Sequence, residues 1–152
     1  MRSNKKTTVF DKYADTYDEG HVKAVAMSGF KPSYFHEYKL KEMVQYLKKE
    51  GLANKKLKLL DFGCGTGSSV KYIKKYLPEF SVYGIDVSAE SIKVAKKDNK
   101  KIKDVTFAPF DGLTIPFDNK FDIIFVANVF HHIKRSNHKK VIKELYKKLN
   151  KN

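Results

Sequence analysis

The sequence predicts a single α/β domain over residues 1–152, in which a mostly parallel sheet lies between two layers of helices. Short apolar runs alternate with helical segments of about ten to fifteen residues from residue 57 onward, a pattern typical of right-handed βαβ crossovers. The 152 residues are 41% apolar, which suffices for one buried core. The lone cysteine, Cys64, excludes an intramolecular disulfide and a cysteine-rich zinc site.

The amino-terminal third is expected to form helices. We predict a helical cap over 1–56 and the α/β core over 57–152. Apolar periodicity is weak over 2–30, which indicates a short helix and a loop. Over 32–50 the apolar residues return at helical spacing, and Gly51 supplies a stop for this helix.

Strands and helices alternate through the rest of the chain. Strands are predicted over four apolar runs, 57–62, 81–86, about 105–108 and 121–127. Helices are predicted over three amphipathic segments, 66–77, 89–99 and 137–149. Pro78 closes the first of these helices, and Ser88 is placed to cap the second.

The formal net charge of +14 is typical of a protein that binds nucleic acid or an anionic surface. Only Arg2 and Arg135 are arginine, however, whereas base and phosphate recognition favours the guanidinium group. The lysines recur between the apolar positions of the predicted helices, as on solvated helix faces. Nucleic acid is therefore the less favoured partner.

The sequence predicts neither export nor membrane insertion. Residues 1–10 carry charge but no apolar leader region. The longest uninterrupted apolar stretch, 123–127, is too short to cross a bilayer. We expect a cytoplasmic protein.

Three glycines, Gly63, Gly65 and Gly67, lie between a predicted buried strand and a helix. In open α/β sheets this edge binds ligands, and glycine lets a ligand approach the main chain. A dinucleotide-binding turn would need its third glycine at the position that Ser68 occupies. No lysine followed by serine or threonine ends the turn, which excludes an ATP-binding P-loop.

The pattern Asp-x-Gly-x-Gly-x-Gly resembles motif I of the class I S-adenosylmethionine-dependent methyltransferases, of the type that acts on small molecules. The resemblance implies a Rossmann-like αβα fold with strand order 3-2-1-4. It also implies that the turn binds S-adenosylmethionine, with S-adenosylhomocysteine as the product. The turn residues that it assigns to the cofactor site are Asp61, Gly63, Cys64, Gly65 and Gly67. A nucleophilic role for Cys64 is not favoured, because no histidine or metal ligand is near it in sequence.

Two further strand ends match the same family. Asp86 ends the second strand about 20 residues after the turn, where a carboxylate can accept hydrogen bonds from a ribose diol. The next residue, Val87, is assigned to the cofactor site as well. A helix cap is the alternative role for Asp86. Phe110, Asp111 and Gly112 resemble the family segment whose aspartate bonds the adenine amino group. The alternative here is an exposed Asp-Gly turn.

The fourth strand and the amino terminus complete the resemblance. It places Asn128 and Val129 at the methionine end of the cofactor, and Tyr13 and Tyr17 in a segment that closes over it. Packing against the sheet is an equal alternative for the two tyrosines.

Two histidines follow the fourth strand. His132 or His131 could act as a general base toward the acceptor, and a structural role at a helix start is the alternative. Adjacent side chains point apart and no third ligand is spaced nearby, so no metal site is predicted.

The resemblance covers only part of the family fold, whose usual sheet has seven strands in the order 3-2-1-4-5-7-6. We therefore expect a fold truncated after the fourth strand, with that strand at an exposed edge that a homo-oligomer would cover. Three hypotheses follow. The first is a methyltransferase with a small-molecule acceptor, the second a non-catalytic S-adenosylmethionine-binding module, and the third an RNA methyltransferase.

Overall fold

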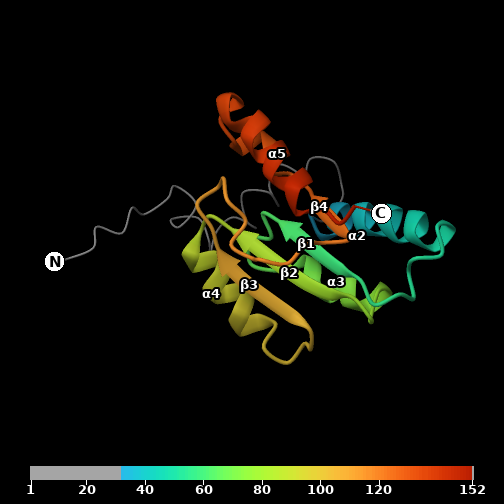
Figure 1. Cartoon of the computed structure of the whole chain (residues 1–152). Coiled ribbons are helices and arrows are strands. Elements are labelled where there is room, and N and C mark those ends of the chain that lie inside the picture. Colours follow the sequence, from blue (N-terminus) through green and yellow to red (C-terminus); the bar gives the residue numbers. More distant parts are fainter. Residues whose placement is uncertain (1–31, 152) are drawn as a thin grey trace.

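A computed structural model describes residues 32–151, and its centre is a parallel sheet (Figure 1). The sheet has four strands in the order β3-β2-β1-β4, and every pairing is parallel. This confirms the predicted α/β fold and strand order. The strands are β1 (Lys58–Phe62), β2 (Ser81–Asp86), β3 (Val105–Pro109) and β4 (Ile123–Val126).

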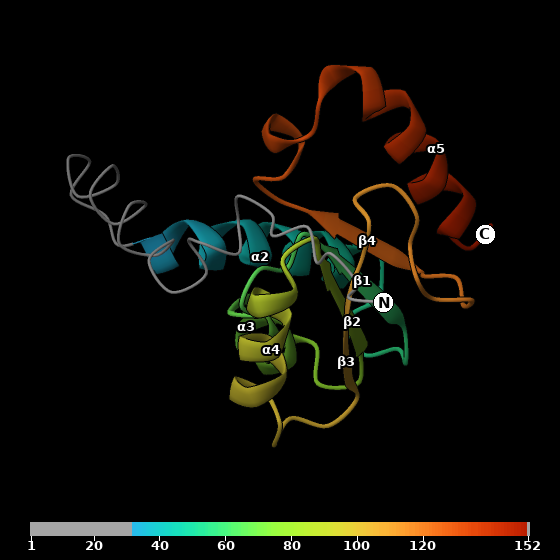
Figure 2. The same cartoon turned by 90° about the vertical axis from the view of Figure 1, so that its left-hand side faces the viewer.

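Helices cover both faces of the sheet, which makes three layers. Figure 2 shows α2, α3 and α4 on one face and α5 on the other. Two short 3-10 turns, η2 and η3, connect β4 to α5. The bounds are α2 (Pro32–Lys49), α3 (Ser69–Tyr76), α4 (Ala89–Asp98), η2 (Phe130–His132), η3 (Arg135–Asn137) and α5 (His138–Lys148).

The central strand β1 is buried on both faces, as expected of a parallel sheet with helices on each side. Neighbouring residues of β1 show the alternation. Leu59 packs into a cluster with residues of α2, α3 and α4, whereas Leu60 packs into a second cluster with Val141 of α5. Both leucines are 0% exposed. The predicted division of the chain into a cap and a core stays a prediction, since α2 shares the first cluster with the sheet.

One predicted boundary is wrong by three residues. The helix expected from residue 66 begins at Ser69, because Gly67 has φ of +74° and cannot lie in a right-handed helix. The fourth strand begins two residues later and ends one residue earlier than the predicted 121–127, and Asn128, two residues past its end, takes φ of +57°. The other predicted elements match the structure within two residues, and Ser88 caps α4 as predicted.

The residues that follow α5 pair with the chain just before β4, at the edge of the sheet. Phe121 and Leu149 form a parallel bridge, and the Asn150 N–H donates to the Phe121 carbonyl at 2.8 Å. Asp122 ties this corner to the sheet. One of its carboxylate oxygens accepts from the Lys58 N–H at 2.8 Å, and the other accepts from the Asn150 amide at 2.6 Å. The homo-oligomer at this edge stays a prediction.

Candidate cofactor site

The glycine turn lies between the end of β1 and the start of α3. Gly63, Gly65 and Gly67 have φ of +79°, +53° and +74°, all in the left-handed region that favours glycine. The N–H groups of Gly63 and Cys64 both donate to the Ile85 carbonyl of β2, at 2.8 and 2.9 Å. The turn is thus held against the neighbouring strand at the carboxyl edge of the sheet, as the sequence predicts.

Asp86 connects the glycine turn to the start of α4. One carboxylate oxygen accepts from the Gly65 N–H and the other from the Ser88 N–H, each at 2.9 Å. The cap of α4 itself is the Ser88 hydroxyl, which accepts from the Ser91 N–H at 3.1 Å. Asp86 therefore organises the turn and joins it to the start of α4.

The glycines differ in what surrounds them. A Cβ placed on Gly63 would come within 2.4 Å of Val129, so the segment after β4 packs directly on the turn. A Cβ on Gly65 would meet no atom of residues 32–151 within 4 Å. The main chain at Gly65 is therefore open on that side, in the way that a ligand lying against the backbone requires.

Gly67 packs against two residues that the sequence did not single out. A Cβ there would lie 2.9 Å from both the Asn99 amide nitrogen and the Phe107 ring. The Asn99 amide also donates to the carbonyls of Gly67 and Ala95, at 3.4 and 2.9 Å. Phe107 reaches Gly84 as well, where an added Cβ would lie 2.6 Å from its ring. No motif marks these contacts, because each depends on residues far apart in the chain.

Asp61 is the buried acid of the turn, with only 3% of its surface exposed. Burial raises its pKa to about 7, the Ser69 hydroxyl lowers it, and the charge of Asp86 raises it. Its Oδ2 has no hydrogen-bond partner in the part of the chain that the structure describes. A buried acceptor without a donor suits a site that a hydrogen-bonding ligand completes.

Cys64 is buried beside this acid. Burial raises the pKa of the thiol well above its usual range, and the nearby Asp61 and Asp86 act in the same direction. The side chain therefore stays a neutral thiol at physiological pH. A neutral, buried thiol is a poor nucleophile, and a nucleophilic role for Cys64 is not favoured by the sequence either.

The segment after β3 lies beside Val87. Phe110 donates its N–H to the Asp86 carbonyl at 3.1 Å, and a Cβ on Gly112 would lie 3.4 Å from Val87. The Asp111 carboxylate accepts from the N–H groups of Leu113 and Thr114, at 2.8 and 2.6 Å. The hydrogen bond from the Thr114 N–H is the largest cause of the lowered pKa of Asp111. Asp111 therefore closes a local turn, and its adenine role stays a prediction.

Asn128 marks the point where the chain leaves β4. Its φ of +57° is unusual for a residue other than glycine, although asparagine tolerates it better than most. The Lys39 ammonium of α2 donates to the Asn128 side-chain oxygen at 2.6 Å. Lys39 and Asn128 are 89 positions apart, and no sequence signal predicts their contact.

His131 and His132 lie in η2, with ring centroids 3.9 Å apart. Burial lowers the pKa of His132, the neighbouring His131 lowers it further, and the Asp86 charge raises it. A neutral imidazole can accept a proton, so the predicted role as a base remains chemically suitable. Tyr13 and Tyr17 lie outside the described residues.

Residues 32–151 contain no group of three or more histidine, cysteine or acidic side chains that is placed to hold a metal ion. No helix in this range combines the length and the apolar character needed to span a bilayer.

The chain is similar to proteins of known family. A family model described as a methyltransferase domain matches residues 59–152. A demethylmenaquinone methyltransferase of Thermotoga maritima is 33% identical over 88 residues, which cover 57% of this chain and 36% of that protein. The chain spans about a third of the length of the curated relatives that it matches first.

Solved structures share the fold. A TehB-like SAM-dependent methyltransferase from Corynebacterium glutamicum has a TM-score of 0.63 at 21% identity, over 91% of this chain and 67% of that chain. PKMT2 from Rickettsia typhi in complex with AdoHcy has a TM-score of 0.56 at 29% identity, over 62% of this chain and 19% of that chain. The family match and this complex support S-adenosylmethionine as the cofactor. The chain belongs to the class I S-adenosylmethionine-dependent methyltransferase family.

Proposed function

We propose that the glycine turn between β1 and α3 holds S-adenosylmethionine, and that the protein transfers its methyl group to a small-molecule acceptor. The observation that carries the proposal is the turn itself. A Cβ on Gly65 would meet none of the described atoms within 4 Å, and the Gly65 N–H donates to Asp86. Val129 packs beside Gly63 of the turn, and Val87 packs beside Gly112.

The side chains present suit the chemical groups of the cofactor. Asp86 is a carboxylate of the kind that binds a ribose diol, and the buried Asp61 Oδ2 is an acceptor without a donor among residues 32–151. When bound, the cofactor supplies a methyl group already activated by a positively charged sulfur. The protein then has to align the acceptor and exclude water. Neutral His132 is the residue of this chain that we propose to receive a proton from the acceptor.

The acceptor class rests on similarity. The Thermotoga maritima relative is named for methyl transfer to demethylmenaquinone, a small molecule. The lysines of this chain lie largely on exposed helix faces, which is the usual place for lysine in any soluble helix, so the charge adds nothing in favour of RNA. A small-molecule acceptor is therefore the proposal to test first.

Isothermal titration with S-adenosylhomocysteine tests the cofactor site. We expect one molecule to bind per chain, and the Asp86→Asn variant to bind about tenfold more weakly or worse, which corresponds to about 1.4 kcal/mol. Asp98→Asn is the matched control, because Asp98 is an exposed acid at the end of α4. Thermal unfolding of both variants verifies that they fold.

Three results would count against the proposal in different ways. No saturable heat with the wild-type protein would exclude the cofactor site. Equal weakening in Asp86→Asn and Asp98→Asn would exclude a direct role for Asp86. Tight binding without methyl transfer to any of a panel of small acceptors would support the alternative of a non-catalytic binding module.

A further inference from the structure

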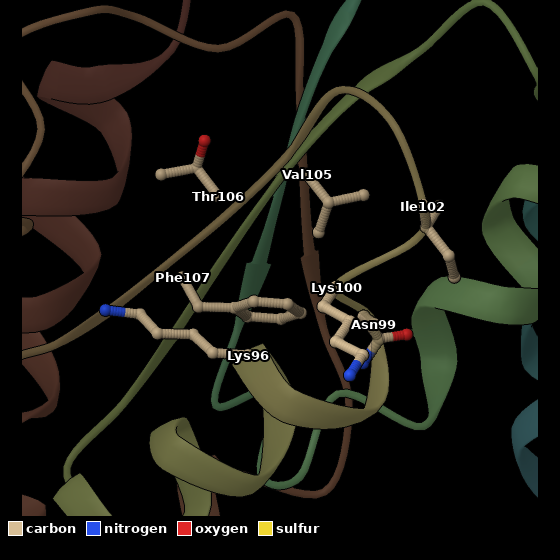
Figure 3. A pocket seen from close by; sticks show the side chains of 7 residues that line it. All are labelled: Lys96, Asn99, Lys100, Ile102, Val105, Thr106 and Phe107. Carbon is tan, nitrogen blue, oxygen red and sulfur yellow. The ribbon is translucent and has the colours of Figure 1, made fainter.

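A cavity lies behind the glycine turn, between α4 and β3, with a volume of about 300 Å³ (Figure 3). Its walls include three apolar side chains, Ile102, Val105 and Phe107. Lys96 and Lys100 also line it, and Figure 3 shows the Phe107 ring between these two lysine side chains. A volume of this size is at the lower end of the range for small-molecule sites.

The two lysines give the cavity its chemical character. Lys96 lies in the last turn of α4, and Lys100 follows one turn later. Within residues 32–151 neither ammonium forms an ion pair, and no acidic side chain lines the cavity. Two uncompensated cations beside an apolar wall are suited to an anion that carries an apolar body.

The cavity shares two residues with the glycine turn. Phe107 lines the cavity and also touches Gly67 and Gly84, where an added Cβ would lie 2.9 and 2.6 Å from its ring. Asn99 lines the cavity and donates to the Gly67 carbonyl at 3.4 Å. Both residues are buried, Asn99 at 4% and Phe107 at 7% exposure. A ligand that shifts either side chain therefore acts on the turn directly, because a packed core transmits small displacements.

We infer that this cavity binds a small anion with an apolar body, attracted by Lys96 and Lys100 on its two sides, and that its occupancy changes the affinity of the glycine turn for the cofactor. Binding at the cavity is independent of the proposed function. The coupling to the turn rests on it. By linkage, the cofactor must change the affinity of the anion by the same factor.

Phenyl phosphate is the probe that tests the cavity, since it joins a ring to a strong anion. We expect saturable binding by isothermal titration, and binding about tenfold weaker or worse in Lys96→Gln/Lys100→Gln. The matched control is Lys97→Gln/Lys101→Gln, which removes the same charge from the same helix end outside the cavity and should bind within about twofold of the wild type. Inorganic phosphate carries only the anion and benzyl alcohol carries only the ring, so both should bind more weakly than phenyl phosphate.

Several outcomes would overturn the cavity site. One is the absence of saturation with phenyl phosphate, and another is equal weakening in the two double variants, which would indicate nonspecific attraction to a basic surface. Inorganic phosphate that binds as well as phenyl phosphate would exclude the apolar contribution.

The coupling has its own readout. We expect saturating phenyl phosphate to change the affinity for S-adenosylhomocysteine by about threefold or more in the wild type, and to leave it unchanged in Lys96→Gln/Lys100→Gln. An unchanged affinity in the wild type would overturn the coupling. If S-adenosylhomocysteine does not bind at all, the proposed function fails, whereas the phenyl phosphate titration still decides whether the cavity is a site.

Discussion

The two sides of the candidate site are built differently. On the β1–β2 side, the glycine turn is held by main-chain bonds to Ile85 and by the Asp86 carboxylate, above strand residues that are almost fully buried. On the β4 side, every residue of the strand is only half-buried. The chain then continues through Asn128 and two short 3-10 turns.

The difference separates two tasks. Proteins place binding residues on loops that a rigid scaffold positions, and the β1–β2 side provides such a scaffold for a fixed ligand. The β4 side has fewer buried contacts with the rest of the protein. The hydrogen bond between Lys39 and Asn128, for example, is exposed. Regions of this kind open at lower free energy than the core. We therefore expect substitutions to cost more on the first side than on the second.

The largest loss of stability is expected from two single substitutions in the turn, Gly67→Ala and Gly65→Ala. Both place alanine in the left-handed region, which costs about 1–2 kcal/mol. Gly67→Ala also forces a Cβ against Asn99 and Phe107, which adds about 1–3 kcal/mol. Urea unfolding should therefore show Gly67→Ala to be the less stable variant by about 1–3 kcal/mol. Equal losses would show that the packing behind Gly67 is looser than the structure indicates.

The next effect is a pH dependence that comes from Asp61. Its pKa of about 7 lies above the ordinary value of 3.8, so between these values the folded state binds a proton that the unfolded state has released. The stability contributed by this proton is present near pH 4 and is lost as the pH rises through 7. Asp61→Asn should remove this loss, so that its stability relative to the wild type increases by about 2 kcal/mol between pH 5 and pH 8.

Chemical denaturation at a series of pH values measures this difference. Ser69→Ala is a useful companion, because the Ser69 hydroxyl lowers the pKa of Asp61 and its removal should move the transition to higher pH. A pH-independent difference between wild type and Asp61→Asn would contradict the buried, protonated acid.

On the β4 side, substitutions of Asn128 should have a smaller effect. Asn128→Ala loses the bond to Lys39 and places a less tolerant residue at φ of +57°, so we expect a loss of about 1 kcal/mol. Asn128→Gly loses the same bond and relieves the backbone, so its stability should stay within about 0.5 kcal/mol of the wild type. If thermal unfolding ranks the two variants in the opposite order, the left-handed conformation at Asn128 is wrong.

The smallest effect is a shift in the titration of His132. Burial and the neighbouring His131 lower its pKa below the ordinary value. NMR titration of the ring protons should give a midpoint below that value, and His131→Asn should raise it, because one repulsive charge is removed. A midpoint that does not respond to His131→Asn would show that the two rings do not interact.

Local signals explain which parts of the fold could be predicted. The strand–helix alternation, the Ser88 cap and the glycine turn each depend on neighbouring residues, and the structure confirms them. The start of α3 was predicted too early, because apolar spacing does not show that Gly67 has a left-handed φ angle, which keeps it out of the helix. The turns η2 and η3 were not predicted, since each is only three residues long.

The residues of the site could be predicted where they belong to a sequence motif. They could not be predicted where their role comes from tertiary packing. Gly63 and Val129 were both assigned from motifs, and the structure brings them into contact. Asn99, Phe107 and Lys39 were missed, because their roles arise from residues brought together only by the folded sheet. The roles assigned to individual residues in cofactor binding stay predictions until the titrations above are made.

Asp122 lies at the end of the sheet opposite the glycine turn. Its carboxylate joins the first residue of β1 to Asn150, and its N–H donates to the Lys58 carbonyl at 2.9 Å. A parallel strand that slips by one residue turns its apolar set to the wrong face. Because Asp122 anchors the register of β1 and β4 from the amino end, the loops at the carboxyl end can change in sequence without shifting the strands. Diversification toward new ligands would then begin in those loops, while substitution of Asp122 would loosen the register itself.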